Sequence, residues 1–190
     1  MRSTKVRDLM IPLSDYPKVH KNVTFYEAVK TLELAQKNLK GNQYPYRAVL
    51  VYDDDGSIIG KIGHRSFLKA LEPNRHIYDE VEKLSRQDLS STYIDSMMHH
   101  MEMWEDNIMD FCHIAQSVKA EDMMQNPNES ISADDTIAQA IHIIVMWNSL
   151  SILVKEKGKI IGLVRITDLY KEVADYILSE CKANQEGGAR

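Results

Sequence analysis

The sequence has little of what disulfide-linked or membrane-spanning chains require. Among its 190 residues are only two cysteines, Cys112 and Cys181, and no Cys-x-x-Cys pair. A disulfide framework is therefore not indicated, and we expect a reduced, cytoplasmic chain. No apolar stretch approaches the roughly 20 residues that a bilayer span needs. No apolar run follows Met1, so nothing resembles a signal peptide, and we expect no membrane partner.

Blocks of basic residues are also missing. The formal net charge is −5, which argues against a large non-specific nucleic-acid footprint, so a nucleic-acid partner is not expected. Apolar residues make up 44% of the chain and charged residues 27%, an ordinary globular balance. A chain of this length and composition buries a core without a structural metal.

Two stretches of the chain carry the same order of signals, which indicates an internal repeat. Thr24 and Thr136 each precede an apolar helical face and are predicted to be helix N-caps. Further on, Gly56 and Gly158 each stand in a charged turn between two apolar runs, which predicts a hairpin. Each copy therefore reads short strand, helix, strand, turn, strand, helix. Aligned on the glycines, the segment 48–60 pairs with 150–162.

The two copies differ in length, and a third kind of segment separates them. Thr24 and Gly56 lie 32 positions apart, but Thr136 and Gly158 only 22, so we place the extra residues of the first copy in the polar stretch 36–45, as an extended helix end and a loop. The connector, 75–116, carries apolar residues spaced alternately by three and four, which predicts a long amphipathic helix. These residues are Ile94, Met97, Met101, Trp104, Ile108, Phe111 and Ala115.

The repeat order, and the run Gly-Lys-Ile-Ile-Gly-Leu-Val-Arg-Ile-Thr-Asp-Leu at 158–169 above all, resemble the CBS (cystathionine-β-synthase) domain. The resemblance implies an α/β (α+β) chain with two β-α-β-β-α repeats, at 1–74 and 117–182, in a pseudo-two-fold pair known as a Bateman module. The connector and a flexible tail at 183–190 lie outside it. It also implies clefts between the copies, and such modules commonly bind AMP, ADP, ATP or S-adenosylmethionine and often dimerise. The resemblance therefore implies a non-catalytic regulatory module that needs no cofactor. Such a module would bind an adenine nucleotide and signal its bound state to a partner protein.

In the second copy the family pattern falls on residues 162–168. Asp168 stands where the family's carboxylate accepts hydrogen bonds from the ribose hydroxyls, a role that suits an acceptor-only group. Arg165 replaces the usual Thr or Ser, and its guanidinium is expected to reach a phosphate. Thr167, beside the Asp, is expected to cap the helix and is counted among the ligand-binding residues. The alternative is that Thr167 and Asp168 serve only as a helix N-cap.

The first copy departs from the pattern. Ser66 replaces the Asp, and Gly63 replaces the Thr or Ser, so the ribose acceptor is weakened. Three possibilities remain open: a half kept for packing, a weak site, or a site that takes an anion through His64 and Arg65.

Apolar walls for an adenine ring are expected from the early part of the second copy and from its strands. The candidates are Met124, Asn126, Pro127, Ile131 and Ile152, although the apolar ones among them are also typical core residues.

Other features are interpreted as structural. The Met97–Met103 run with His99 lies on the connector seam, so we predict packing and no metal site. Asp53 to Asp55 resemble a calcium loop only by charge, and Cys112 has no catalytic partner in view. The seam with Trp104 and Phe111 predicts a homodimer. A ligand-free interaction scaffold is the rival hypothesis, favoured by the missing first-copy Asp.

Overall fold

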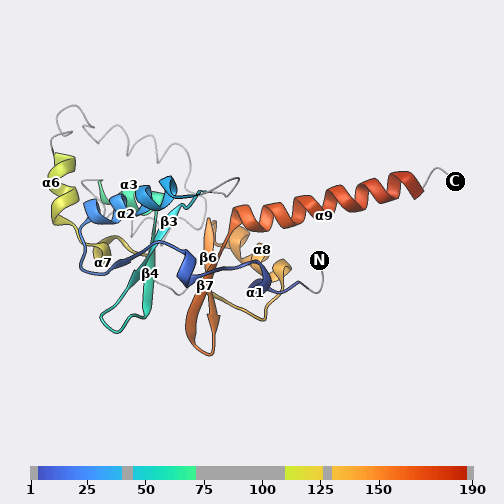
Figure 1. Ribbon diagram of the computed structural model, residues 1–190, viewed down its shortest axis with the longest axis horizontal. Helices are drawn as coiled ribbons and strands as arrows, with labels where there is room; N and C mark the ends of the chain where they lie inside the picture. The colour runs from blue at the N-terminus through green and yellow to red at the C-terminus, as the bar shows by residue number, and fades with distance from the viewer. Residues whose placement is uncertain (1–3, 40–44, 72–109, 126–129, 188–190) are drawn as a thin grey trace, which may run out of the picture.

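The computed structural model describes residues 4–39, 45–71, 110–125 and 130–187. Their helices and strands follow the duplicated order expected from the sequence (Figure 1). They are α1 (Val6–Leu9), β1 (Ile11–Pro12), the 3-10 turn η1 (Leu13–Asp15), β2 (Lys18–His20), α2 (Phe25–Lys37), β3 (Ala48–Tyr52), β4 (Ile58–Gly63), α3 (His64–Ala70), α6 (Asp110–Ser117), α7 (Ala120–Met123), β5 (Ser130–Ser132), α8 (Ile137–Met146), β6 (Ser151–Glu156), β7 (Lys159–Arg165) and α9 (Ile166–Gly187).

The first long helix of each repeat starts where the sequence predicts. The Thr24 hydroxyl accepts a hydrogen bond from the Glu27 backbone N–H, and the Glu27 carboxylate accepts one from the Thr24 N–H at 2.8 Å. Thr136 and Gln139 form the same reciprocal capping box at the start of α8. Such a box satisfies two backbone donors that the helix leaves free, so both N-cap predictions are confirmed.

Both predicted hairpins are present, with one correction to their alignment. Gly56 and Gly158 turn with φ of 79° and 80°, which a residue without a Cβ adopts at little cost. In the ladders, Val51 lies opposite Gly60 and Val154 lies opposite Gly162. Val51 thus corresponds to Val154, one residue away from the alignment drawn on the turn glycines, because the first turn is one residue longer.

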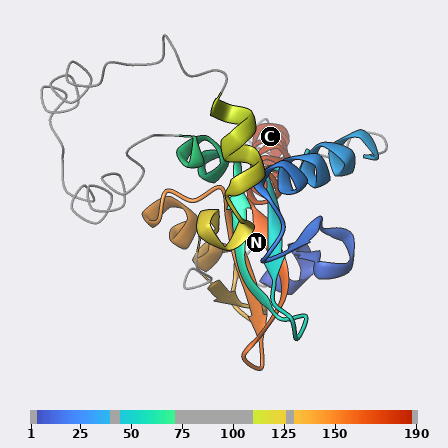
Figure 2. The same ribbon diagram turned by 90° about the vertical axis from the view of Figure 1, so that its left-hand side faces the viewer.

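The strands alternate between two cores. In β3, Val49 and Val51 face the helices of their own repeat, while Leu50 faces the other sheet. In β6, Leu153 likewise faces inward to the interface between the repeats, and Leu163 of β7 joins it there. The sheets lie side by side with their hairpin turns pointing the same way (Figures 1 and 2). The two repeats are therefore joined by a third apolar layer in which these leucines are fully buried.

The opening segment of each repeat packs on the other repeat. β1 pairs with β7, giving the sheet order β1-β7-β6-β5, while the other sheet is β2-β3-β4. Val6 of α1 lies in the core of the second repeat. In exchange, Ala120 and Met123 of α7 lie in the core of the first. The pseudo-two-fold pair is therefore held together by crossed segments as well as by the leucine layer.

Two expectations about the helices need comment. α9 continues to Gly187, so most of the range 183–190, expected to be a tail, is helical, and Figure 1 shows α9 running away from the two sheets. Most of the expected connector helix lies outside the described residues. Its described end, α6, is helical, and Ile114 and Ala115 pack against the core of the first repeat. The four-residue helix α7 precedes β5.

The crossing of the opening segments generates a stability prediction. A Cβ placed on Gly162 would lie 2.6 Å from the carbonyl oxygen of Ile11, a backbone atom that cannot rotate away. We expect Gly162→Ala to lower the free energy of unfolding by about 1–3 kcal/mol, the usual cost of overpacking. Urea unfolding followed by circular dichroism measures this. Gly63→Ala is the control, since its Cβ would have 3.7 Å to the nearest atom; equal losses from both variants would contradict the crossing.

Candidate ligand cleft between the two repeats

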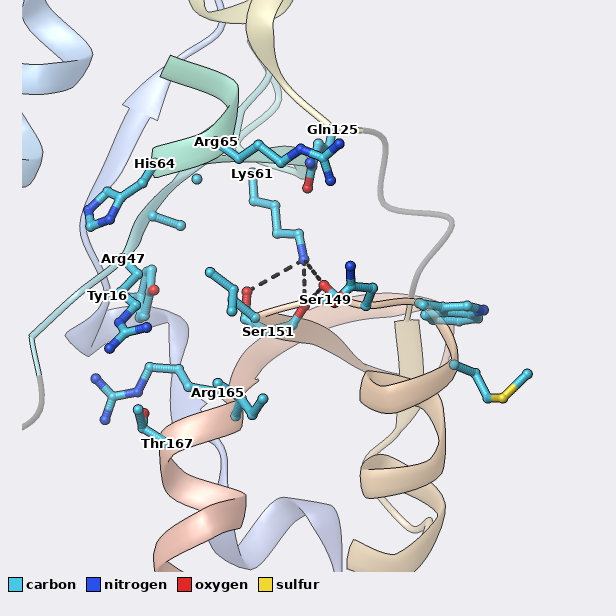
Figure 3. A pocket seen from close by; sticks show the side chains of 17 residues that line it. Tyr16, Arg47, Lys61, His64, Arg65, Gln125, Ser149, Ser151, Arg165 and Thr167 are labelled. Atoms are coloured by element: carbon cyan, nitrogen blue, oxygen red, sulfur yellow. Dashed lines mark hydrogen bonds between the residues drawn. The ribbon is translucent and has the colours of Figure 1, made fainter. Parts of the chain in front are cut away.

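A cleft of about 650 Å³ opens where the two repeats meet. Its walls come from the junction of β4 with α3, the junction of β7 with α9, and the turn between α8 and β6 (Figure 3). The lining residues are Tyr16, Arg47, Ala48, Lys61, Gly63, His64, Arg65, Gln125, Met146, Trp147, Asn148, Ser149, Leu150, Ser151, Arg165, Ile166 and Thr167. Both repeats thus contribute to one cavity.

The two strand-to-helix junctions explain why polar side chains gather here. β4 ends at Gly63 and α3 begins at His64, and β7 ends at Arg165 and α9 begins at Ile166, with no loop between strand and helix. The first side chains of each helix therefore stand at the carboxyl end of a strand, at the rim of the sheet. Gly63 lies opposite Ala48 in the first sheet, and Arg165 lies opposite Ser151 in the second. Gly63 and Arg165 therefore occupy equivalent positions in the two repeats.

Positive charge is concentrated in this cleft although the whole chain carries a net charge of −5. Arg47, Lys61, Arg65 and Arg165 line it together with the imidazole of His64, and among the described lining residues there is no Asp or Glu. Charges of one sign gathered in a cleft with low-dielectric walls focus the field and raise the local concentration of counter-ions. The cleft is therefore suited to an anion.

Arg165 and Asp168 form a tight ion pair beside the cleft. Arg165 donates from Nε and from Nη2 to the two carboxylate oxygens of Asp168, at 2.7 Å each, and the side chains are 11% and 13% exposed. Burial alone would lower the pKa of Arg165, but the hydrogen bonds and charge of Asp168 outweigh it and hold that pKa above its usual value. Arg165 lines the cleft, whereas Asp168 is not one of the lining residues and contacts the guanidinium.

Thr167 does not act as the N-cap of α9. It lies in the first turn of α9, and its hydroxyl oxygen is buried without a hydrogen-bond partner among the described residues. A buried hydroxyl with no partner costs free energy, so such groups call for an explanation. Thr167 is one of the residues that line the cleft.

Lys61 is the cleft residue that the sequence reasoning missed most clearly. It is only 4% exposed, and its ammonium donates across the repeats to the Ser151 carbonyl, to Ser149 Oγ at 3.3 Å and to Ser151 Oγ at 3.4 Å (Figure 3). A signal was present, because Lys61 is a charged residue in the middle of the apolar run 58–62. The sequence reasoning also missed Arg47 and the turn at 146–151, because only the folding of the chain brings them to the cleft.

Tyr16 supplies an aromatic wall from the first repeat. It is 4% exposed, and its ring meets that of Tyr46 edge to face with centroids 5.0 Å apart. Burial raises the pKa of the Tyr16 phenol, and the nearby charge of Arg165 opposes this only in part. The phenol therefore stays protonated at physiological pH and remains a hydrogen-bond donor.

The structure places the other expected site residues as follows. His64 and Arg65 line the cleft. Met124 packs on Gly60, against the first core, while Ile131 and Ile152 are core residues of the second repeat with 3% and 0% exposure. These three apolar residues do not line the described cleft. Asn126 and Pro127 lie outside the described residues.

The features interpreted as structural can be checked in part. Asp53 and Asp54 both form ion pairs with Lys21, and a carboxylate oxygen of Asp54 also lies 2.9 Å from Nε2 of His20. The hydrogen bond from Lys21 lowers the pKa of Asp53, so the acidic turn is paired within the protein. Over the described ranges, no three metal-binding side chains cluster. The Met97–Met103 run lies outside these ranges.

Of the helices in the described part, none combines the length and apolarity needed to cross a membrane.

A known family model matches both of the β-α-β-β-α repeats described above. The model for the CBS domain matches residues 6–73 and again 120–175. The chain belongs to the CBS domain family. Proteins with these domains are generally regulatory rather than catalytic. Among curated protein sequences, none matches.

Solved structures of CBS proteins share this fold. A CBS domain from a membrane protein of Sphaerobacter thermophilus is 22% identical, with a TM-score of 0.57, over 90% of this chain and 88% of that one. The protein ATU1752 of Agrobacterium tumefaciens is 18% identical, with a TM-score of 0.57, over 90% and 93%. CBSX2, in complex with AMP, is 14% identical, with a TM-score of 0.56, over 90% and 97%. The expected fold of tandem CBS repeats is thereby confirmed.

The ion pair beside the cleft generates the next prediction. Removing one partner leaves a nearly buried charge without its counter-ion, whereas removing both does not. In a double-mutant cycle of Arg165→Met and Asp168→Asn, we expect a coupling energy on the order of 1–3 kcal/mol. Urea unfolding of the four proteins measures it. Additive losses would show that the two side chains do not depend on each other in solution.

Proposed function

We propose that this CBS pair is a regulatory module that binds an adenine nucleotide in the cleft between its repeats and passes the bound state to a partner protein. The observation that carries the proposal is the cleft itself. It is lined from both repeats by Arg47, Lys61, His64, Arg65 and Arg165, with no carboxylate among the described lining residues. A ligand that fits this charge is one with phosphate groups.

The phosphates would find several donors. A helix N-terminus offers free backbone N–H groups and a partial positive charge, and the 22-residue helix α9 begins in the cleft. The hydroxyl of Thr167 lies in that first turn and lacks a partner among the described residues. Arg47 and Arg165 add planar guanidinium groups that bind phosphate oxygens in pairs.

The nucleoside would occupy the less charged part of the cleft. Trp147, Leu150 and Ile166 line it, and Trp147 supplies an aromatic face for a purine. Asp168 is proposed as the ribose acceptor, as the family pattern implies. Because Asp168 is paired with Arg165 at 2.7 Å, it reaches a ribose only when Arg165 turns toward the phosphate. The complex of CBSX2 with AMP supports an adenine nucleotide as the ligand.

The charge of the cleft also distinguishes between the family's ligands. S-Adenosylmethionine carries a sulfonium and an ammonium against one carboxylate, so it brings net positive charge into a cationic cleft. ATP and ADP bring several negative charges. We therefore propose the order ATP and ADP before AMP, and S-adenosylmethionine last.

Signalling would follow from differential binding. A ligand that contacts both repeats favours the relative placement in which both sets of contacts form, and so shifts the population toward it. α9 starts in the cleft with Ile166 and Thr167 and runs away from the two sheets (Figure 1). A small change at its first turn would therefore move its far end, where a partner protein could detect it.

A ligand-free scaffold is the second candidate. It is favoured by the ion pair that occupies Asp168, and by Ser66, a buried hydroxyl in place of the first-copy carboxylate. In that case the cations of the cleft would serve only to hold the repeats together.

Nucleotide titration separates the two functions. We expect ATP to raise the melting temperature, because a ligand that binds only the folded state stabilises it. Arg47→Ala should weaken ATP binding about tenfold or more, the cost of losing a charged hydrogen bond. Isothermal calorimetry measures both affinities. Lys171→Ala, on exposed α9 surface outside the cleft, is the matched control and should bind as the wild type does. A wild-type chain that binds no nucleotide would support the scaffold.

We also propose a homodimer. The expected seam lies mostly outside the described residues, but α8 and α9 expose large apolar side chains. Val145 is 69% exposed, Tyr170 70% and Leu178 69%. This is more apolar surface than a pair of solvated helices usually leaves in contact with water.

This surface predicts the outcome of light scattering. The wild-type chain should have the mass of a dimer, and Tyr170→Glu with Leu178→Glu should shift it toward the monomer, because a charge cannot be buried in an apolar interface without a partner. A monomeric wild-type protein at high concentration would contradict the dimer.

A further inference from the structure

Lys61 stands where the symmetry of the molecule provides an apolar residue. In the ladders, Lys61 lies opposite Leu50 and Leu163 lies opposite Leu153, so Lys61 and Leu163 occupy equivalent places in the two repeats. Leu163 is fully buried in the apolar layer between the sheets. An ammonium at such a place costs solvation free energy that a leucine would not. Packing alone therefore does not account for Lys61.

The side chain of Lys61 links the repeats through one turn. Its ammonium donates to Ser149 Oγ, to Ser151 Oγ and to the Ser151 carbonyl, which also accepts from Ser149 Oγ at 2.8 Å. This turn follows α8 and passes through Asn148, whose φ is 47°. The backbone of Lys61 is fixed separately, because its N–H and carbonyl bond to Gln125 of the crossing segment. The side chain can therefore change partners while the strand stays in place.

The same ammonium lines the cleft, where Figure 3 shows it between the start of α3 and the Ser149–Ser151 turn. The three Ser oxygens are neutral acceptors, and a hydrogen bond from an ammonium to a phosphate oxygen is roughly twice as strong as one between neutral groups. An ammonium has three N–H donors, so each one given to a phosphate is taken from its present partners.

We propose that Lys61 is a phosphate-binding residue of the cleft and the link through which phosphate occupancy loosens the Ser149–Ser151 turn. The inference rests on the proposed nucleotide function and adds to it a specificity determinant and a coupling route. Since the second repeat has Leu163 at the equivalent place, only one half of the cleft has this cation. A nucleotide whose phosphate chain reaches Lys61 gains a contact that a shorter one does not.

The substitution Lys61→Met tests the binding role in the full chain. It keeps the length of the side chain and removes the charge. We expect ATP affinity to fall tenfold or more and AMP affinity by less than threefold, measured by calorimetry. Leu163→Met changes packing at the equivalent position and should preserve the preference for ATP over AMP. An unchanged ratio of the two affinities in Lys61→Met would overturn the inference.

Ser149→Ala tests the competition and keeps the inference testable if Lys61→Met folds poorly. Removing this acceptor leaves the ammonium less engaged with the turn, so ATP affinity should rise two- to threefold. Hydrogen exchange should show faster exchange at 149–151 on adding ATP to the wild type, and no such change in Lys61→Met. A fall in ATP affinity for Ser149→Ala would overturn the competition between the turn and the phosphate for Lys61. If the wild type binds no nucleotide, the proposed function fails; nucleotide binding without these differences removes only the role of Lys61.

Discussion

The exchange of opening segments between the repeats sets the geometry of everything else. At each crossing a backbone passes over a glycine: Ile11 over Gly162 and Gln125 over Gly60, at distances that leave no room for a Cβ. Each repeat thus completes its neighbour's core, with Val6 in one and Met123 in the other. Neither half can form its full core without the opening segment of the other, so the cleft at their junction is built as the chain folds.

The leucine layer restricts charged side chains to the edge of the interface between the repeats. Leu50, Leu153 and Leu163 close the centre of the interface to water. Each fully buried leucine contributes roughly 1.5–3 kcal/mol relative to an exposed one. Polar groups are therefore displaced to the rim, where β4 and β7 end and their helices begin. Arg165 and the first turn of α9 reach the cleft because a strand passes directly into a helix at that rim. Lys61 is the exception, and its length lets its ammonium reach the same rim.

Local signals in the sequence were sufficient to predict the main helices and strands of each repeat, but not the short opening helices α1 and α7. Thr24 and Thr136 cap helices because the partner of each hydroxyl is only three residues away. The hairpins follow from two glycines with positive φ. The strand alignment was wrong by one residue because a turn of different length leaves the apolar pattern almost unchanged. Only the ladder partners of Val51 reveal the shift.

The candidate site could be predicted only in part, because its groups meet across long stretches of chain. His64, Arg65, Arg165 and Thr167 were expected at a site and do line the cleft. The pairing of Arg165 with Asp168 was not foreseen, although the two are three residues apart. Two side chains expected to face a ligand instead bond to each other. Lys61 bonds to residues 88 and 90 positions away, a contact that no local pattern contains.

The two halves of the cleft share a backbone plan but differ in chemistry. The first half supplies Lys61 and Arg47 where the second has Leu163 and Leu150, while the second supplies Arg165 where the first has Gly63. Asp168, which corresponds to Ser66, holds Arg165 but does not itself line the cleft. A symmetric cleft would bind a ligand equally well in two opposite orientations. Here the two halves are not equivalent, because the first has Lys61 where the second has Leu163, and the second has an Arg165 that is paired with Asp168. The two opposite orientations of a ligand that contacts both halves would therefore differ in their contacts.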